Sequence, residues 1–167
     1  VFGAEFVFMQ PVTALARDGD QFVVTLSDSG PVRCYAVILA MGARYRRLDV
    51  PSLEALIGNG VFYGGPTSEA SAFAGRDVFI VGGANSAGQA ALHLARYARA
   101  VTLVVRADSL RAGMSEYLVR QIEATDNIQT RLGCQVVGGG GNGRLEHLVL
   151  RDIGSHTDAT VEASALF

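Results

Sequence analysis

A short apolar run that opens into small residues decides the fold of this chain: VFIVGGANSAG, residues 78–88. The apolar residues favour a buried strand, the glycines favour a tight turn, and the alanine-rich sequence that follows favours a helix. A strand, a tight turn and a helix in this order direct backbone N–H groups and a helix N-terminus at one point. The stretch therefore predicts the phosphate-binding turn of a dinucleotide-binding βαβ unit.

The turn follows the Gly-x-Gly-x-x-Gly/Ala pattern with one departure. Gly82 stands where the strand must turn sharply, and Ala87 is small enough for the helix to pack on the strand. Ala84 occupies the middle-glycine position, where its methyl group would stand close to a pyrophosphate. Asn85 or Ser86 is expected to cap the helix. A turn of this kind can be purely structural, but the strand before it and the helix after it favour nucleotide binding. We expect the pyrophosphate to be held by Gly82, Gly83, Ala84, Asn85, Ser86 and Ala87.

The rest of the second half alternates between strands and helices. The pattern predicts strand 77–82, helix 85–98, strand 101–106, helix 115–124 and strand 128–132. This βαβαβ order predicts a parallel sheet with helices on its faces. Further strands at 134–137, 145–152 and 157–163 are expected to form an antiparallel set. The glycine cluster 138–143 between the first two is interpreted as a mobile hairpin tip without a function.

The first part of the chain is predicted to be β structure. Strands are expected at 5–9, 13–17, 21–27 and 32–39, with an Asp-Gly turn at 18–20 and a buried segment at 36–40. In the strand 21–27, the alternation of apolar Phe22, Val24 and Leu26 predicts one buried and one exposed face. Pro51 favours an extended residue before it, so a domain boundary is expected there, followed by a short helix near 53–57.

The end of the second strand of the βαβ unit indicates which dinucleotide is bound. In NAD sites this position usually carries an Asp or Glu that binds the ribose hydroxyls. Here the predicted strand ends on Arg106, and Arg111 follows in the same loop. A guanidinium can pair bidentately with a 2′-phosphate, so both residues favour NADPH over NADH. Two alternatives stay open: arginines at strand ends are often only solvated, and Asp108 could bind a ribose if the loop turned inward.

Composition and charge exclude several classes of protein. Apolar residues make up 49% of the 167 and charged residues 18%, which is typical of a globular protein. The net charge of −2 gives no reason to expect a nucleic-acid partner. No apolar run is long enough to cross a bilayer, and Cys34 and Cys134 have no metal-ligand spacing, so we expect no membrane partner, no metal and a cytoplasmic setting. Both ends look cut, and we interpret the chain as a fragment of a longer protein.

These residues resemble the low-molecular-weight thioredoxin reductase family, within the two-dinucleotide-binding flavoprotein oxidoreductases. The stretch VGGANSA (81–87) is similar to that family's NADPH-binding turn. Residues 106–111 are similar to its His-Arg-Arg-x-x-x-Arg phosphate-binding segment, with Val105 and Ala107 in place of the first and third residues. The stretch ILAMGA (38–43) is similar to the Ala-Thr-Gly segment at the FAD/NADPH domain junction, and residues 161–167 to the strand that returns to the FAD domain.

The resemblance implies an α/β fold: a Rossmann-like NAD(P)-binding domain, with a βαβαβ parallel sheet and an antiparallel β-meander, and a β-rich remnant of an FAD-binding domain. It implies that residues 1–49 belong to the FAD domain, 50–163 to the NADPH domain and 164–167 to the start of the return strand. The implied cofactors are NADPH and, in the full-length protein only, FAD. The implied reaction moves a hydride from NADPH to FAD and then electrons to a Cys-x-x-Cys disulfide, and the fragment itself is expected to carry no catalytic residue.

That disulfide is missing from the sequence. The family places it just before the nucleotide-binding strand, and the matching stretch, GVFYGGPTSEA (60–70), contains no cysteine. Cys34 and Cys134 fall in different predicted domains and are expected to be buried small hydrophobic residues. Two functions besides thioredoxin reduction therefore stay open. One is a flavin reductase that passes electrons to ferredoxin or a small acceptor; the other is a non-catalytic redox-sensing module, which Ala84 also favours.

Two further side chains and the partners complete the expectations. Tyr63 lies where the missing disulfide would face the flavin, so it either stacks there or fills a gap. His93 lies between leucines on the predicted helix and is interpreted as a packing or surface residue. The expected partner is an electron-acceptor protein or small molecule whose identity stays open, with a homodimer as one assembly of the full-length protein.

Overall fold

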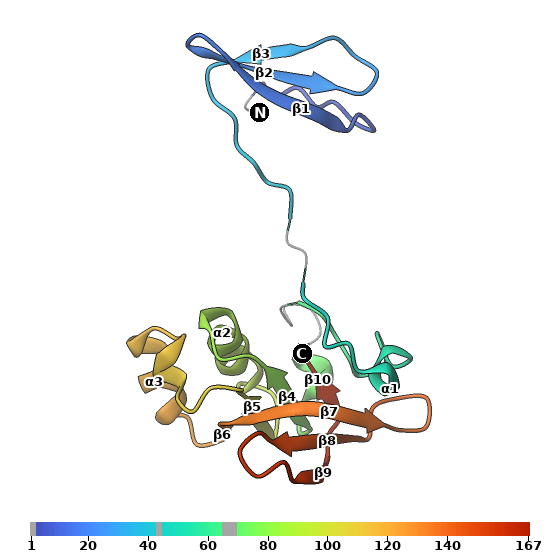
Figure 1. Ribbon diagram of the computed structural model, residues 1–167, viewed down its shortest axis with the longest axis vertical. Helices are drawn as coiled ribbons and strands as arrows, with labels where there is room; N and C mark the ends of the chain where they lie inside the picture. Colours follow the sequence, from blue (N-terminus) through green and yellow to red (C-terminus); the bar gives the residue numbers. More distant parts are fainter. Residues whose placement is uncertain (1–2, 43–44, 65–69) are drawn as a thin grey trace. The chain divides into compact units, whose positions relative to one another are not determined.

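The computed structural model describes residues 3–42, 45–64 and 70–167, and the chain divides into two compact units, Val1–Arg44 and Tyr45–Phe167 (Figure 1). The first unit is an antiparallel sheet in the order β1-β2-β3, with β1 at Val12–Asp18, β2 at Gln21–Leu26 and β3 at Val32–Cys34. Gly19 has a φ of 63° in the turn between β1 and β2, a conformation that suits glycine. The hairpin predicted from the Asp-Gly signal is thereby confirmed.

Other expectations for this unit are wrong. Residues 5–9 and 36–40 form no strand, and Ile38 is 91% exposed. No strand among the described residues pairs with either segment, and a β-strand without a hydrogen-bonded neighbour has no ladder to hold it. Strand β2 is half-buried along its whole length instead of alternating. The described residues of this unit provide no helix or second sheet that would bury one face selectively.

The second unit is built on a four-stranded parallel sheet in the order β10-β4-β5-β6. The strands are β4 (Asp77–Val81), β5 (Ala100–Val104), β6 (Ile128–Arg131) and β10 (Ala165–Leu166). Helices α2 (Asn85–Leu94) and α3 (Glu116–Glu123) connect β4 to β5 and β5 to β6. The predicted βαβαβ alternation is confirmed, with both helices shorter than expected.

The parallel sheet has a layer on each face (Figure 1). Side chains of Val78 and Ile80 pack with α2 and α3, whereas Phe79 between them packs with the antiparallel strands. This alternation follows from the period of two residues in a strand. The second layer is the antiparallel sheet β7-β8-β9, with β7 at Cys134–Gly140, β8 at His147–Asp152 and β9 at Asp158–Glu162. Because β4 is covered on both faces, its sequence is apolar on both faces.

The first half of the glycine cluster, residues 138–140, is strand, so its interpretation as a hairpin tip is wrong there, whereas residues 141–143 do lie in the connection between β7 and β8. Gly138, Gly139 and Gly140 pair with β8. A Cβ on Gly139 would lie 2.7 Å from a methyl group of Leu53 and 2.7 Å from the carbonyl oxygen of His147. The absence of side chains therefore lets the short helix α1 (Pro51–Glu54), which carries Leu53, pack directly on β7.

The remaining elements are short. Two 3₁₀ turns, η1 (Ala70–Phe73) and η2 (Leu110–Ala112), precede β4 and α3 respectively. Strand β10 pairs in parallel with β4, so residues 165–166 belong to the same sheet as the strand that leads into the glycine turn. Within the described ranges, no helix has both the length and the apolar character needed to cross a membrane.

Candidate functional site

The glycine turn at the carboxyl end of β4 is closely packed. Gly82 has a φ of 143°, and its N–H donates to the carbonyl oxygen of Val104, 3.1 Å away. A Cβ on Gly82 would lie 3.1 Å from the Cβ of Ala87, and one on Gly83 would lie 2.6 Å from a methyl group of Val105. Both glycines therefore let the chain turn tightly between α2 and the end of β5. The backbone of this turn lies at the carboxyl edge of a parallel sheet, where α/β proteins bind ligands.

The N-terminus of α2 is open. Ala84 is its N-cap residue, with φ −104° and ψ 176°, and no side chain caps the helix. The first helical bond runs from the Gly88 N–H to the Ala84 carbonyl oxygen at 3.1 Å. The preceding amides of the first turn have no partner among the residues described, and the turn contains no acidic side chain. Free N–H groups and the positive end of the helix dipole attract an anion.

Capping by Asn85 or Ser86 is a wrong expectation. The Asn85 Oδ1 accepts a hydrogen bond from the Ser115 N–H at 2.8 Å, so this side chain supports the start of α3. The sequence gives no local sign of this contact because the two residues are thirty positions apart. Asn85 thus joins the glycine turn to the loop that follows β5.

Asn85→Ala should lower the free energy of unfolding by about 1 kcal/mol, because it leaves an N-terminal amide of α3 without its acceptor. Urea unfolding followed by circular dichroism measures the change. Asn142→Ala, at an exposed position beyond β7, is the matched control and should leave stability unchanged. Equal midpoints for the two variants would show that the Asn85 bond contributes nothing.

The two arginines proposed for the 2′-phosphate lie in different surroundings. Arg106 is exposed just beyond β5 and has no ion pair or hydrogen bond with any described residue. Arg111 is bound by two carboxylates of α3: its Nη1 lies 2.9 Å from Glu123 Oε1, and its Nε lies 3.2 Å from Glu116 Oε2. The hydrogen bonds that Arg111 donates to Glu123 and Glu116 raise the pKa of Arg111 above its usual value. Asp108 is exposed in the same loop.

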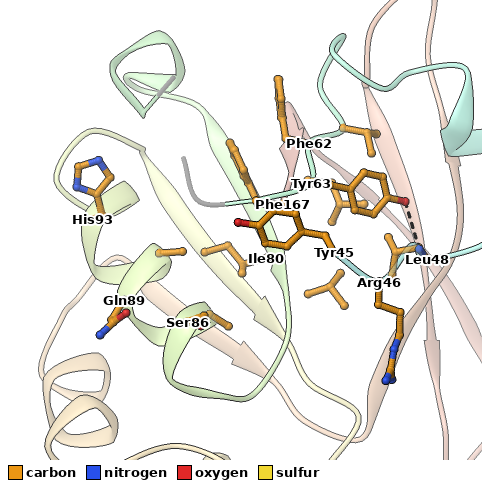
Figure 2. A pocket seen from close by; sticks show the side chains of 16 residues that line it. Tyr45, Arg46, Leu48, Phe62, Tyr63, Ile80, Ser86, Gln89, His93 and Phe167 are labelled. Carbon is orange, nitrogen blue, oxygen red and sulfur yellow. Dashed lines mark hydrogen bonds between the residues drawn. The ribbon is translucent and has the colours of Figure 1, made fainter. Parts of the chain in front are cut away.

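A pocket of about 480 Å³ adjoins the glycine turn. We call it the aromatic pocket, because rings form much of its wall. Figure 2 shows Ser86, Gln89 and His93 on α2 at one side and several aromatic residues at the other. Phe62 and Phe167 are stacked with ring centroids 5.0 Å apart. Described residues that line the pocket and bear on the argument are Tyr45, Phe62, Tyr63, Ser86, His93 and Phe167.

Sequence reasoning missed this pocket as a whole. Tyr45, Phe62 and Phe167 come from three separate segments, so no local pattern joins them. The helical part could have been found, because Ser86, Ala90 and His93 are spaced as one stripe of a helix.

Tyr63 and His93 now have defined surroundings. The Tyr63 hydroxyl accepts a hydrogen bond from the Leu48 N–H at 3.2 Å (Figure 2). Glu54 Oε1 lies 3.5 Å from the same hydroxyl. Tyr63 is thus fixed in place, with its ring in the pocket wall. The His93 ring packs edge-on against Tyr97, and its Nε2 atom is buried without a partner in the described part of the chain. Residues 65–69, which belong to the stretch where the family places its disulfide, lie outside the described residues.

Both cysteines are free, and they belong to different units of the chain. Cys34 is half-buried in β3, whereas Cys134 is buried in β7 of the second unit. Burial raises the pKa of the Cys134 thiol, which disfavours the reactive thiolate. In the described ranges, no three or more His, Cys, Asp or Glu side chains gather as metal ligands.

Comparisons of this chain with known proteins agree on one family. Residues 4–131 match the family model described as pyridine nucleotide-disulphide oxidoreductase. The chain is 34% identical over 166 residues to the thioredoxin reductase of Streptomyces clavuligerus, covering 99% of this chain and 50% of that protein. It is 33% identical to the bifunctional thioredoxin reductase/thioredoxin of Mycobacterium leprae, covering 99% of this chain and 35% of the other.

A solved structure has the same fold. The thioredoxin reductase from Giardia duodenalis superposes with a TM-score of 0.80 at 23% identity, covering 99% of this chain and 53% of that one. The chain thus spans about half, or less, of the length of the proteins it matches.

Proposed function

Since this chain belongs to the pyridine nucleotide-disulphide oxidoreductase family and is thioredoxin reductase-like within it, we propose that it is the NADPH-binding segment of a flavoprotein oxidoreductase. In the full-length protein, the proposed reaction transfers a hydride from NADPH to FAD. Binding and orientation of NADPH are the contribution of the residues described here. By itself the chain is expected to bind the nucleotide weakly and not to turn over.

The observation that carries the proposal is the open N-terminus of α2 beside the tight glycine turn. The residues fit a pyrophosphate, because the uncapped amides supply hydrogen-bond donors and any Cβ on Gly82 or Gly83 would crowd the turn. Ala84 has an extended backbone that any residue adopts, so the departure from glycine there does not distort the turn. Its methyl group still limits how closely a phosphate can approach.

The aromatic pocket is proposed to receive the nicotinamide end of the coenzyme. Ser86 and Ala87 belong both to the first turn of α2 and to the wall of this pocket, so one ligand can reach both places. The apolar walls of the pocket suit a flat ring such as nicotinamide. At the other end, Arg106 is proposed to pair with the 2′-phosphate.

The domain boundaries are part of the same proposal. Residues 1–49 are proposed as part of the FAD-binding domain, 50–163 as the NADPH-binding domain and 164–167 as the start of the return to the FAD domain. FAD supplies the hydride acceptor when bound. We propose no individual FAD-binding residue in this chain.

Arg106→Ala should weaken NADPH binding about 10-fold, because it removes a charge-assisted hydrogen bond to the 2′-phosphate. NADH binding should stay the same, since NADH lacks that phosphate. Calorimetric titration of the chain with each nucleotide measures both constants. Arg76→Ala, at an exposed arginine before β4 and thus at the opposite end of that strand, is the control and should change neither. Equal affinity of the unmodified chain for NADPH and NADH, unaltered by Arg106→Ala, would contradict the phosphate role.

A second function is favoured by the cysteines. A disulfide relay needs two thiols a few ångströms apart, and the chain has only Cys34 and Cys134, in different units. The alternative is an NADPH-dependent flavin reductase that passes electrons to ferredoxin or a small acceptor. A further alternative is a nucleotide-binding redox sensor without turnover.

A steady-state assay of the full-length protein separates these functions. Activity with NADPH and a dye acceptor is expected of either enzyme and not of a sensor. Addition of thioredoxin, and separately of ferredoxin, then distinguishes the two enzymes by which protein is reduced.

A further inference from the structure

Arg111 lies in η2, and charged side chains along one face of α3 bind it. Glu116, Arg120 and Glu123 follow one another at helical spacing, and Arg120 Nε lies 3.1 Å from Glu116 Oε1. The Glu123 carboxylate binds the Arg111 guanidinium in a bidentate manner: Nη1 donates to Oε1 at 2.9 Å and Nη2 donates to Oε2 at 3.3 Å. Glu116 takes the remaining Nε at 3.2 Å. The donors of Arg111 that could form a fork with a phosphate are therefore already bound to carboxylates.

This ion pair lies beside a small hollow that is lined by the loop after β5, the end of α3 and strand β6. The hollow has a volume of about 190 Å³, and its charged lining residues are Asp108, Arg111 and Glu123. Two carboxylates and one guanidinium give it a formal charge of −1. A 2′-phosphate that reached Arg111 would displace Glu123 and then face its carboxylate at short range.

We propose that Glu123 determines coenzyme specificity by competing with the adenosine 2′-phosphate for Arg111. The inference rests on the proposed function, since it concerns the same nucleotide site. Arg106, which has no partner among the described residues, is the arginine that favours NADPH. Glu123 opposes this preference in two ways: it occupies the donors of Arg111 and it repels the phosphate dianion.

Glu123→Gln is the direct test, because it removes the charge and retains the size of the side chain. The probes are 2′,5′-ADP and 5′-AMP, which differ by the 2′-phosphate alone. The variant should bind 2′,5′-ADP about 3- to 10-fold more tightly than the unmodified chain, and 5′-AMP with less than a twofold change. The gain should shrink as salt is added, since the groups are exposed. Calorimetry of the 167-residue chain measures all constants.

A matched control and a double-mutant cycle isolate the competition. Glu146→Gln removes the same charge from an exposed glutamate that pairs with Arg144, at residues that line neither the hollow nor the aromatic pocket. It should leave both affinities unchanged. Arg111→Ala should matter little in the unmodified chain, where the guanidinium is occupied, but should abolish the gain in the Glu123→Gln background.

The outcomes separate this inference from the proposed function. If the unmodified chain binds 2′,5′-ADP and Arg106→Ala weakens it, but Glu123→Gln changes nothing, only the specificity role is overturned. The specificity role is also overturned if Glu146→Gln gives the same gain in 2′,5′-ADP affinity, or if the gain persists after Arg111→Ala. In either case the gain comes from the change in net charge and not from competition for Arg111. If the unmodified chain binds neither probe nor NADPH, the proposed function itself is overturned.

Discussion

Gly82→Val should reduce the affinity for NADPH by about 30-fold or more, which is about 2 kcal/mol of binding free energy. The φ of 143° at Gly82 is one that a β-branched residue cannot adopt without strain, which costs about 1–3 kcal/mol. Its Cβ would also lie 3.1 Å from the Cβ of Ala87, so relief of the strain moves the start of α2. The amides proposed to hold the pyrophosphate would move with it. Titration of the variant with NADPH measures the loss.

Gly58→Val controls for backbone strain alone. Gly58 has a φ of 82°, and a Cβ there would meet no heavy atom within 4 Å. It lines neither the aromatic pocket nor the hollow beside Arg111. This variant should lose stability and keep its affinity for NADPH. If Gly82→Val binds NADPH as tightly as Gly58→Val does, the glycine turn is not the pyrophosphate site.

The sequence was sufficient for features that depend on local patterns. The apolar run of β4, the turn at Gly82 and the alanine-rich α2 each carry a strong short-range signal. The alternation of strands and helices that follows favours a parallel sheet with right-handed connections. The same is true of the Asp-Gly hairpin at Gly19. The family resemblance is confirmed by the match over residues 4–131, whereas the individual nucleotide-binding residues remain predictions.

Features that depend on distant neighbours could not be predicted. Asn85 looks like a helix cap in sequence, but Ser115 offers a better-placed donor from a segment thirty residues away. The apolar segment 36–40 has the composition of a buried strand, yet no described strand lies beside it to complete a ladder. Arg111 looks available to a phosphate until α3 brings Glu123 within 2.9 Å of it. For Asn85 and Arg111 a tertiary contact overrides the local preference, and for segment 36–40 the described residues lack the neighbouring strand that the local preference needs.

Phe79→Ala should lower the free energy of unfolding by about 3–5 kcal/mol, the cost of truncating a buried phenylalanine. Phe79 is only 7% exposed and belongs to the core cluster between the parallel sheet and β7-β8-β9. Val136 and Leu148 of the antiparallel sheet belong to the same cluster. A loss of this size is a large part of the total stability of a domain, which is about 5–15 kcal/mol. Urea unfolding followed by circular dichroism measures it.

Tyr117→Ala is the matched control, because it removes an aromatic ring that is 58% exposed on α3 and leaves no cavity. It should change stability by less than about 0.5 kcal/mol. The comparison tests whether the antiparallel sheet is a packed layer of the nucleotide-binding unit. A loss below about 1 kcal/mol for Phe79→Ala, at a site where a cavity would otherwise form, would mean that the two sheets do not share a core. A full loss means that the layer behind β4 holds the strand, and with it the glycine turn, in place.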